Sequence, residues 1–355
     1  MTRFLLAGGG TAGHVNPLLA LADALVADDS ENQVWALGTR EGLESTLVPE
    51  RGYDLLTVER LPFPRKPSWY ALTFPFRFLR AIGQVKDYLK TNKIDAVVGF
   101  GGYASAPAYL AAKSLRIPSV VHEANALPGW ANKLGAKSAR AVGVTFKSTP
   151  IANATFVGMP LRREIEALSA NGDKEAARLH FGLDPDTITL LVTGGSLGAK
   201  RLNETIEQSR RVLSAAGIQV LHIMGGRSEL PEVHEKDYVR IAYCDRMDLA
   251  ILASSFAVSR AGSSTVSEFS AVGLPAAYVP YPVGNGEQKL NVADVVSGEG
   301  GLMVADADFT DAYVSNTLVP LISNSRALAA MANSAKKVGV ADGTARLLAL
   351  VKGVL

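Results

Sequence analysis

Two glycine-rich turns are the segments of this chain whose residue types and spacing most clearly indicate chemistry. Residues 8–13 read GGGTAG and residues 194–199 read GGSLGA, and each turn follows a short apolar run and leads into a helical pattern. Glycine lets the backbone approach a phosphate, and the start of the next helix supplies free N–H groups and a positive dipole. The turns predict anion sites in two nucleotide-fold halves, which we expect to face each other.

The first turn also satisfies the G-x-G-x-x-G pattern of dinucleotide sites through Gly8, Gly10 and Gly13. The acidic residue that such sites place on the ribose about 20 residues later is missing from 38–40. Arg40 could meet a 2′-phosphate instead, so an NADP-dependent oxidoreductase stays open as an alternative.

Polar side chains of the second half follow two predicted strands. Segment 259–268 runs from a strand into a helix that brings Glu268 near its start, where a carboxylate can accept from both hydroxyls of a ribose. The alternative is an ordinary acid of a first helical turn, favoured by the dipole. Amides at 285–291 follow the next strand, at the sheet edge where open α/β sheets bind ligands. Neutral amides can bind sugar hydroxyls.

Aromatic and cationic residues are interleaved between Arg60 and Arg80. The aromatic residues are Phe63, Trp69, Tyr70, Phe74, Phe76 and Phe78, and the cationic ones within the segment are Arg65, Lys66 and Arg77. This mixture suits a membrane headgroup boundary, with Arg65, Lys66 and Trp69 as contacts. The alternative is a partly buried amphipathic segment whose aromatic residues belong to the core.

Composition limits the class of protein. A chain of 355 residues with 48% hydrophobic residues can form two domains with buried cores, and a net charge of +2 gives no reason to expect a nucleic-acid partner. The single cysteine, Cys244, excludes a disulfide framework and favours a reducing cytoplasm. With no signal peptide and no apolar run of about 18 residues, we expect at most peripheral membrane attachment.

Strand, turn and helix patterns alternate along the chain, which is typical of an α/β fold with parallel sheets. We expect helices starting at Asn16-Pro17, over 200–216, and over 343–354, the last of which could belong to either half. The expected strands are 4–7, 33–37, 96–100, 119–122, 188–193, 219–224, 257–259 and 276–279.

Five segments, in chain order, carry a resemblance to a known family. They are 9–14 (GGTAGH), 101–103 (GGY), 122–125 (HEAN), 194–199 (GGSLGA) and 260–268 (RAGSSTVSE). Together they resemble MurG, the family of N-acetylglucosamine transferases that convert lipid I to lipid II in bacterial peptidoglycan synthesis. The chain departs from the common family pattern at Ala124 and Leu197, where glutamine is frequent. We therefore assign no site role to those two positions.

The resemblance implies a GT-B fold, with two Rossmann-like parallel-sheet domains separated by a cleft. The expected N-terminal domain, 1–158 plus a returning helix in 338–355, takes the lipid acceptor and faces the membrane, and 159–337 takes the UDP-sugar. Family members invert the anomeric centre and use neither metal nor cofactor. The D-x-D patterns at 184–186 and 306–308 are accordingly interpreted as solvated acids.

The resemblance also implies site residues. Glu268 would hold the ribose, Ser196 a donor phosphate, and Arg162 with backbone near Cys244 the uracil. The sugar would contact Asn125, Glu287 and Gln288, and the helix start at Ser263 would face the diphosphate. The full donor set is Thr11, Gly13, Asn125, Arg162, Ser196, Cys244, Ser263, Glu268, Glu287 and Gln288, and the acceptor and diphosphate set is Gly13, His14, Gly102 and Tyr103.

The reaction needs a base and a stabilised leaving group. His14 is the first candidate because an imidazole titrates near neutral pH, with orientation of an acceptor phosphate as its alternative role. Glu123 is the rival base. Arg260 and helix-terminal N–H groups could stabilise the departing UDP.

The expected partners are UDP-N-acetylglucosamine, lipid I, the cytoplasmic face of the cell membrane and proteins of cell-wall synthesis. Three alternatives stay open: the NADP-dependent oxidoreductase, a non-catalytic sugar-nucleotide binding protein, and a related GT-B enzyme with another lipid or natural-product acceptor.

Overall fold

The computed structural model describes residues 1–64, 66–195 and 198–355. The chain forms two compact units, Met1–Arg162 with Asp342–Leu355, and Arg163–Ala341. Arg65, Ser196 and Leu197 lie outside the described residues, so the roles expected of Arg65 and Ser196 remain predictions.

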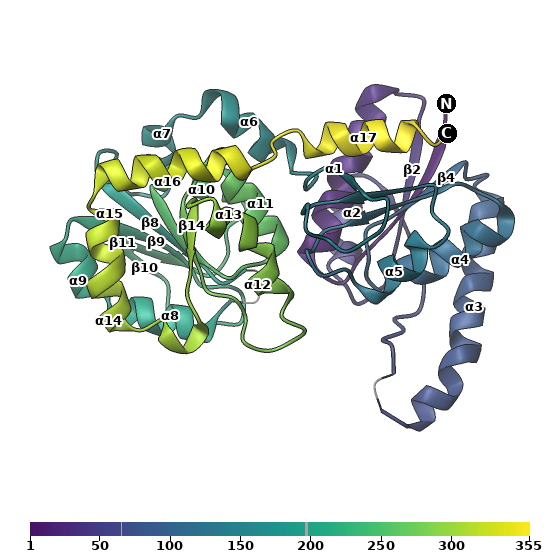
Figure 1. Ribbon diagram of the computed structural model, residues 1–355, viewed down its shortest axis with the longest axis horizontal. Coiled ribbons are helices and arrows are strands. Elements are labelled where there is room, and N and C mark those ends of the chain that lie inside the picture. The colour runs from purple at the N-terminus through teal and green to yellow at the C-terminus, as the bar shows by residue number, and fades with distance from the viewer. Residues whose placement is uncertain (65, 196–197) are drawn as a thin grey trace. The chain divides into compact units, whose positions relative to one another are not determined.

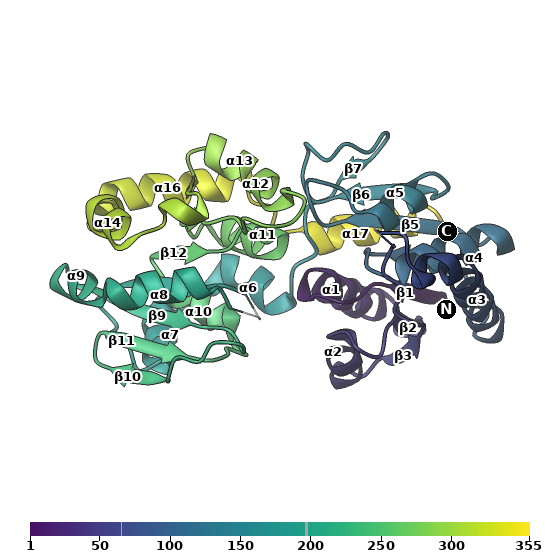
Figure 2. The same cartoon turned by 90° about the horizontal axis from the view of Figure 1, so that it is seen from below.

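The first unit contains a seven-stranded parallel sheet in the order β3-β2-β1-β4-β5-β6-β7. Its strands are β1 Arg3–Ala7, β2 Gln33–Gly38, β3 Asp54–Thr57, β4 Ala96–Gly99, β5 Ser119–Glu123, β6 Ala141–Val144 and β7 Thr155–Phe156. Its helices are α1 Ala12–Asp28, α2 Glu44–Glu50, α3 Trp69–Thr91, α4 Ser105–Leu115, α5 Trp130–Ala136 and α17 Gly343–Lys352. Figures 1 and 2 show helices on both faces of this sheet.

Both faces of the first sheet are buried, which explains why its strands are continuous apolar runs. Leu5 and Leu6 point to opposite faces and are both fully buried, one in the core under α3 and α4 and the other in the core under α1. Leu347 and Val351 of α17 pack into the core that contains Leu6. The last helix therefore belongs to the first unit, beside α1 (Figure 1).

The second unit repeats this plan in the order β10-β11-β9-β8-β12-β13-β14, parallel except for the β10–β11 pair. Its strands are β8 Ile188–Thr193, β9 Ile218–Ile223, β10 Val233–Glu235, β11 Tyr238–Ile241, β12 Phe256–Ser259, β13 Ala276–Tyr278 and β14 Gly301–Met303. The main helices are α6 Arg163–Asn171, α7 Lys174–His180, α8 Lys200–Gln208, α9 Arg210–Ala215, α10 Met247–Ala253, α11 Ser263–Val272, α12 Glu287–Asn291, α13 Ala293–Ser297 and α16 Ser325–Val338.

Two helix predictions were wrong. Helix α1 begins at Ala12, not after Asn16, because the glycine turn itself runs into the helix: the Val15 N–H donates to the Thr11 carbonyl at 3.1 Å. Pro17 lies inside α1, where it removes a single backbone bond. The helix expected over 200–216 is two helices, which meet at Ser209.

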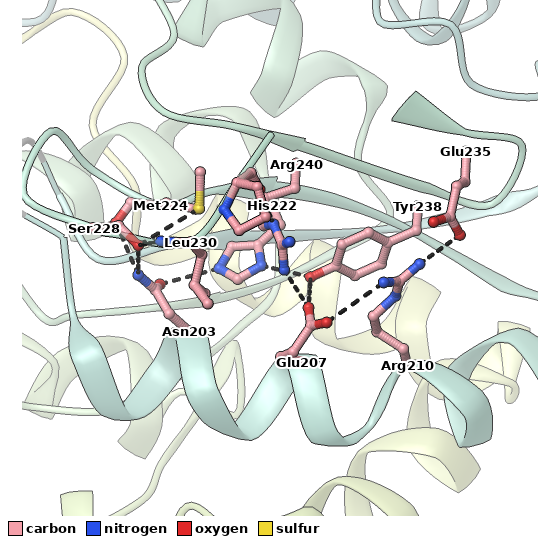
Figure 3. A network of polar contacts seen from close by, with 11 residues as sticks. Asn203, Glu207, Arg210, His222, Met224, Ser228, Leu230, Glu235, Tyr238 and Arg240 are labelled. Carbon is pink, nitrogen blue, oxygen red and sulfur yellow. Dashed lines mark hydrogen bonds and ion pairs between the residues drawn. The ribbon is translucent and has the colours of Figure 1, made fainter. Parts of the chain in front are cut away.

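A buried polar network joins α8 to β9 and β11 (Figure 3). His222 contacts the Tyr238 hydroxyl through Nδ1 at 2.7 Å and the Asn203 Oδ1 through Nε2 at 3.0 Å. Asn203 donates to the Met224 carbonyl at 3.1 Å, so its oxygen accepts and His222 carries its hydrogen on Nε2. Burial lowers the pKa of His222 to about 3. This neutral histidine anchors α8 where it leaves the second glycine turn.

Candidate functional site

Several of the predicted site residues follow the carboxyl ends of strands near the centre of each sheet. Strand order reverses between β1 and β4 in the first unit and between β8 and β12 in the second. Open α/β sheets bind ligands beyond the carboxyl ends of strands at such switch points. The first glycine turn follows β1 and the second follows β8, so each unit presents a ligand edge of its own.

His14 is the third residue of α1 and is half-buried beside the first glycine turn. Its Nδ1 lies 3.0 Å from the Gly9 carbonyl and 3.4 Å from the Thr11 hydroxyl. A carbonyl oxygen only accepts, so the shorter contact places the imidazole hydrogen on Nδ1. The neutral ring then carries its lone pair on Nε2, where it can take a proton.

The turn after β4 packs against the first glycine turn. Gly102 has a φ of +80°, and a Cβ there would lie 2.6 Å from the Gly9 carbonyl oxygen. A Cβ at Gly101 would lie 3.1 Å from Nε2 of His14. Tyr103 is half-buried, with the Arg60 guanidinium 5.4 Å from its ring centroid. The first unit thus brings His14 and the turn that contains Gly102 together, and the Tyr103 ring lies beside Arg60.

Glu123, at the end of β5, is engaged within its own loop. Its carboxylate accepts from the N–H of Asn125 at 2.9 Å, the N–H of Gly129 at 3.0 Å and Nδ2 of Asn132 at 2.9 Å. Its side chain is 2% exposed. Asn125 itself is half-buried, and its carbonyl accepts from the Thr149 hydroxyl at 3.2 Å. Glu123 therefore shapes the loop that presents Asn125.

A second imidazole lies near His14 but is inaccessible. His122 is fully buried in β5, and its Nε2 contacts the Gly158 carbonyl at 3.1 Å. Burial, more than the proximity of His14, lowers the pKa of His122 to about 4. His122 is consequently neutral at physiological pH and belongs to the fold.

In the second unit, α11 begins without a side-chain cap. Gly262 is its N-cap residue and has no side chain, so it supplies no side-chain acceptor to the first N–H groups of the helix. The Ser264 hydroxyl is buried with no hydrogen-bond partner among the described residues. Ser263 is buried, and Glu268, the sixth helical residue, is 8% exposed. Glu268 thus lies in the second turn, and the first-turn interpretation was wrong.

Gln288 bridges the loop that follows β12 and the loop that follows β13. Its Oε1 accepts from the N–H of Tyr281 at 2.8 Å and from the N–H of Ala261 at 3.2 Å. With the oxygen so used, the amide hydrogens are the group that a sugar hydroxyl can meet. Glu287 is the first residue of α12 and is half-buried.

Asp306 differs from its predicted role, and Arg260 is one of its ion-pair partners. Arg260 is 13% exposed at its side chain and pairs with Asp306 at 2.6 Å, and it donates to the Val279 carbonyl at 3.0 Å. Arg201 is a second partner of Asp306, at 3.0 Å. Asp306 is therefore an ion-paired, mostly buried acid and not a solvated one. Nη1 of Arg260 is held by these protein groups, and the expected role of Arg260 at the leaving phosphate stays a prediction.

The two residues expected at the uracil lie in different units. Arg162 is the last residue of the first unit's main segment and directly precedes α6. Cys244 is buried and follows β11 in the second unit. Their shared role stays a prediction.

Comparison with known families decides the class of the protein. The glycosyltransferase family 28 N-terminal domain matches residues 4–144, and the family 28 C-terminal domain matches residues 189–347. The chain belongs to glycosyltransferase family 28. The two family 28 domains match the two observed units in order.

Curated relatives are similar to this chain over nearly its whole length. A protein of Clavibacter sepedonicus is 56% identical over 99% of this chain and 96% of its own, and one of Streptomyces coelicolor is 49% identical over 98% and 96%. Both are named UDP-N-acetylglucosamine–N-acetylmuramyl-(pentapeptide) pyrophosphoryl-undecaprenol N-acetylglucosamine transferase.

Solved structures agree with the fold. The crystal structure of Acinetobacter baumannii MurG superposes with a TM-score of 0.78 at 25% identity, covering 99% of this chain and all of that one. The kitacinnamycin glycosyltransferase shares the fold, with a TM-score of 0.70 at 16% identity over 100% of this chain and 99% of its own. The predicted GT-B class, with two Rossmann-like parallel-sheet domains, is confirmed.

Sequence reasoning missed one buried acid at the site of this family 28 enzyme. Glu44 is fully buried and lies directly against the first glycine turn, where its carboxylate accepts from the Gly10 N–H at 2.7 Å. Glu44 follows a turn in the sequence and carries no motif, so only its spacing after β2 could have drawn notice. It uses the N–H that a dinucleotide phosphate would need, which disfavours the NADP alternative.

The interleaved aromatic segment divides between two environments. Phe74 is buried with Leu61 and Ala81, and the core interpretation holds for it. Four apolar residues of α3 form an exposed stripe at helical spacing: Trp69 at 79% exposure, Leu72 at 67%, Phe76 at 76% and Leu79 at 64%. Figure 1 shows the first turns of α3 extending beyond the body of the first unit.

Proposed function

We propose that this chain transfers N-acetylglucosamine from UDP-N-acetylglucosamine to the 4-hydroxyl of the muramic acid of lipid I, forming lipid II with inversion. The full-length identity to relatives that carry this activity in their names supports the reaction. The structural observation that carries the proposal is the pair of polar groups beside the two switch points. They are the His14 imidazole in the first unit and the N-terminus of α11, which has no side-chain cap, in the second.

The acceptor hydroxyl attacks the anomeric carbon as the bond to UDP breaks. The hydroxyl proton goes to Nε2 of His14, and the bonding electrons leave on the β-phosphate oxygen of UDP. The geometry favours His14 over Glu123 as the base, because the Glu123 carboxylate is buried and accepts three hydrogen bonds from its own loop. A single displacement converts the α-linked donor into a β-linked product.

The departing UDP acquires negative charge, which needs donors that are already in place. The first N–H groups of α11 and the unpartnered Ser264 hydroxyl supply such donors without a metal. Glu268 is proposed to accept from the ribose hydroxyls, and Gln288, Glu287 and Asn125 to contact the sugar. Thr11 and Gly13, at the start of α1, complete the proposed set together with Arg162, Cys244 and Ser263.

We further propose peripheral attachment to the cytoplasmic face of the membrane through α3. Within residues 1–64, 66–195 and 198–355, no helix, α3 included, is both long enough and apolar enough to cross a bilayer. The exposed stripe of Trp69, Leu72, Phe76 and Leu79 can enter the acyl boundary while exposed Lys66 and Arg80 meet anionic headgroups. Such a contact would bring the acceptor loops to a lipid-linked substrate.

The stereochemistry of the product tests this mechanism. NMR of the disaccharide made from a short-chain lipid I analogue should show a β linkage to the 4-position of muramic acid. An α linkage would mean retention of configuration, which the single displacement proposed here cannot give.

A further inference from the structure

Glu44 is a carboxylate buried beneath the first glycine turn. It is the first residue of α2 and is fully buried. Oε2 accepts from the Gly10 N–H at 2.7 Å, and Oε1 accepts from the Thr39 N–H at 2.8 Å and the Thr39 hydroxyl at 2.9 Å. Burying a charged group is costly unless it is hydrogen-bonded. These neutral donors, rather than a cation, satisfy it.

Two glycines, Gly9 and Gly42, pack closely against this carboxylate. A Cβ at Gly9 would lie 2.3 Å from Oε1 of Glu44, and a Cβ at Gly42 would lie 2.1 Å from Oε2. A side chain at either position would displace the carboxylate, so the turn and the segment before α2 close directly on it. Such close enclosure fixes the position of Glu44 and of the peptide it binds.

One peptide group connects Glu44 to His14. The N–H of Gly10 and the carbonyl of Gly9 belong to the same planar peptide, and in a trans peptide they point in opposite directions. On one side the N–H donates to Glu44 at 2.7 Å, and on the other the carbonyl accepts from Nδ1 of His14 at 3.0 Å. Glu44 therefore sets the orientation of this peptide, and that orientation decides which group the peptide presents to Nδ1 of His14.

We propose that Glu44 is a positioning residue, which holds the Gly9–Gly10 peptide so that its carbonyl keeps the hydrogen of His14 on Nδ1 and the lone pair on Nε2. Gly10 has a φ of +88° and no side chain, so no side chain of its own opposes a flip of this peptide. The tautomer of a histidine is set by the hydrogen bond that its other nitrogen makes. The expected effect on kcat rests on the proposed function of His14 as the base. The expected Nδ1–H tautomer of His14 does not depend on that function.

Glu44→Gln is the informative change because an amide cannot accept on both sides. Whichever way it turns, its NH₂ group faces either Gly10 or Thr39, both of which present an N–H. A flip of the Gly9–Gly10 peptide would relieve that clash by offering the amide a carbonyl, and would remove the carbonyl from His14. We expect E44Q to lose the Nδ1–H form of His14.

The experiment is nitrogen NMR of histidine-labelled full-length protein, with the His14 signals assigned by their loss in His14→Gln, together with steady-state kinetics. Wild type should show Nδ1–H at His14. E44Q should shift His14 toward Nε2–H and lower kcat by at least about tenfold, at a nearly unchanged KM for the donor. Finding Nε2–H in the wild type would overturn the proposal even if E44Q does not fold.

Two controls separate positioning from stability. Val48→Ala removes a fully buried side chain from the same helix, and Thr39→Val removes only the hydroxyl contact to Oε1. Both should lower the melting temperature and keep the His14 tautomer and kcat. A V48A enzyme as slow as E44Q would overturn the proposal. A changed tautomer in E44Q with wild-type kcat would support the positioning role and refute His14 as the base.

Discussion

At the scale of single residues, burial and hydrogen bonding distinguish groups that look equivalent in the sequence. His14 and Glu123 are both polar residues near strand ends, yet one is half-buried with a nitrogen directed away from its carbonyl partner and the other is enclosed by three donors. The sequence placed His14 first but could not exclude Glu123, because the partners of Glu123 are mostly backbone N–H groups of a loop. Glu44 was missed for the same reason.

Replacing His14 by alanine should lower kcat by about a hundredfold or more, the usual contribution of a general base, while KM for the donor changes little. His180→Gln is a matched control because His180 is exposed on α7. Steady-state kinetics at saturating acceptor would measure both constants. Wild-type turnover in His14→Ala would remove His14 from the mechanism.

At the scale of elements, the sequence predicted those with a regular, fully buried pattern. The central strands β1, β4, β8 and β12 are continuous apolar runs and were all found. Short or edge strands such as β3 and β10 were not predicted, since each has exposed residues and only three or four positions. The division of α3 into a buried side and an exposed stripe also required the structure, because both sides carry aromatic residues.

The exposed stripe makes a membrane prediction for α3. The double variant Leu72→Ser, Phe76→Ser should bind anionic vesicles at least about tenfold more weakly, since burying each such side chain contributes about 1.5–3 kcal/mol. Its fold should be unaffected because both side chains are exposed. Vesicle flotation measures the bound fraction.

The control for that experiment is Leu179→Ser, which removes an equally exposed leucine from the second unit. Binding should keep its wild-type strength in the control and weaken with salt in the wild type. Unchanged flotation of the double variant would rule out α3 as the contact.

At the scale of the whole molecule, the sequence predicted two Rossmann-like halves, because the glycine turns mark the first crossover of each sheet. The residue pattern left the last helix unassigned, since an amphipathic pattern does not say which core it covers, and the family resemblance placed it in the N-terminal domain. The structure assigns α17 through Leu347 and Val351. Two buried neutral histidines, one in each unit, add a property that composition could not predict.

The stability of the protein should fall with pH below about 6.5, the ordinary pKa of histidine. His122 and His222, with pKa values lowered to about 4 and about 3, stay unprotonated in the folded state while the unfolded chain takes up protons. Each contributes a slope of roughly 1.4 kcal/mol per pH unit in that window. Chemical denaturation between pH 7 and about 5 measures the free energy of unfolding. His122→Gln should reduce the slope of the unfolding free energy against pH, and His180→Gln should leave it unchanged. Equal slopes in the wild type and both variants would contradict a buried, neutral His122.

Transfer of labelled sugar from UDP-N-acetylglucosamine to a short-chain lipid I analogue tests the central claim most directly. The reaction would contain excess chelator, with UDP-glucose and UDP-N-acetylgalactosamine as competing donors. We predict a product that depends on the acceptor, forms from UDP-N-acetylglucosamine alone and persists in chelator. No product while UDP remains bound would contradict the proposed acceptor, and activity that is lost in chelator and restored by magnesium would contradict a metal-free site.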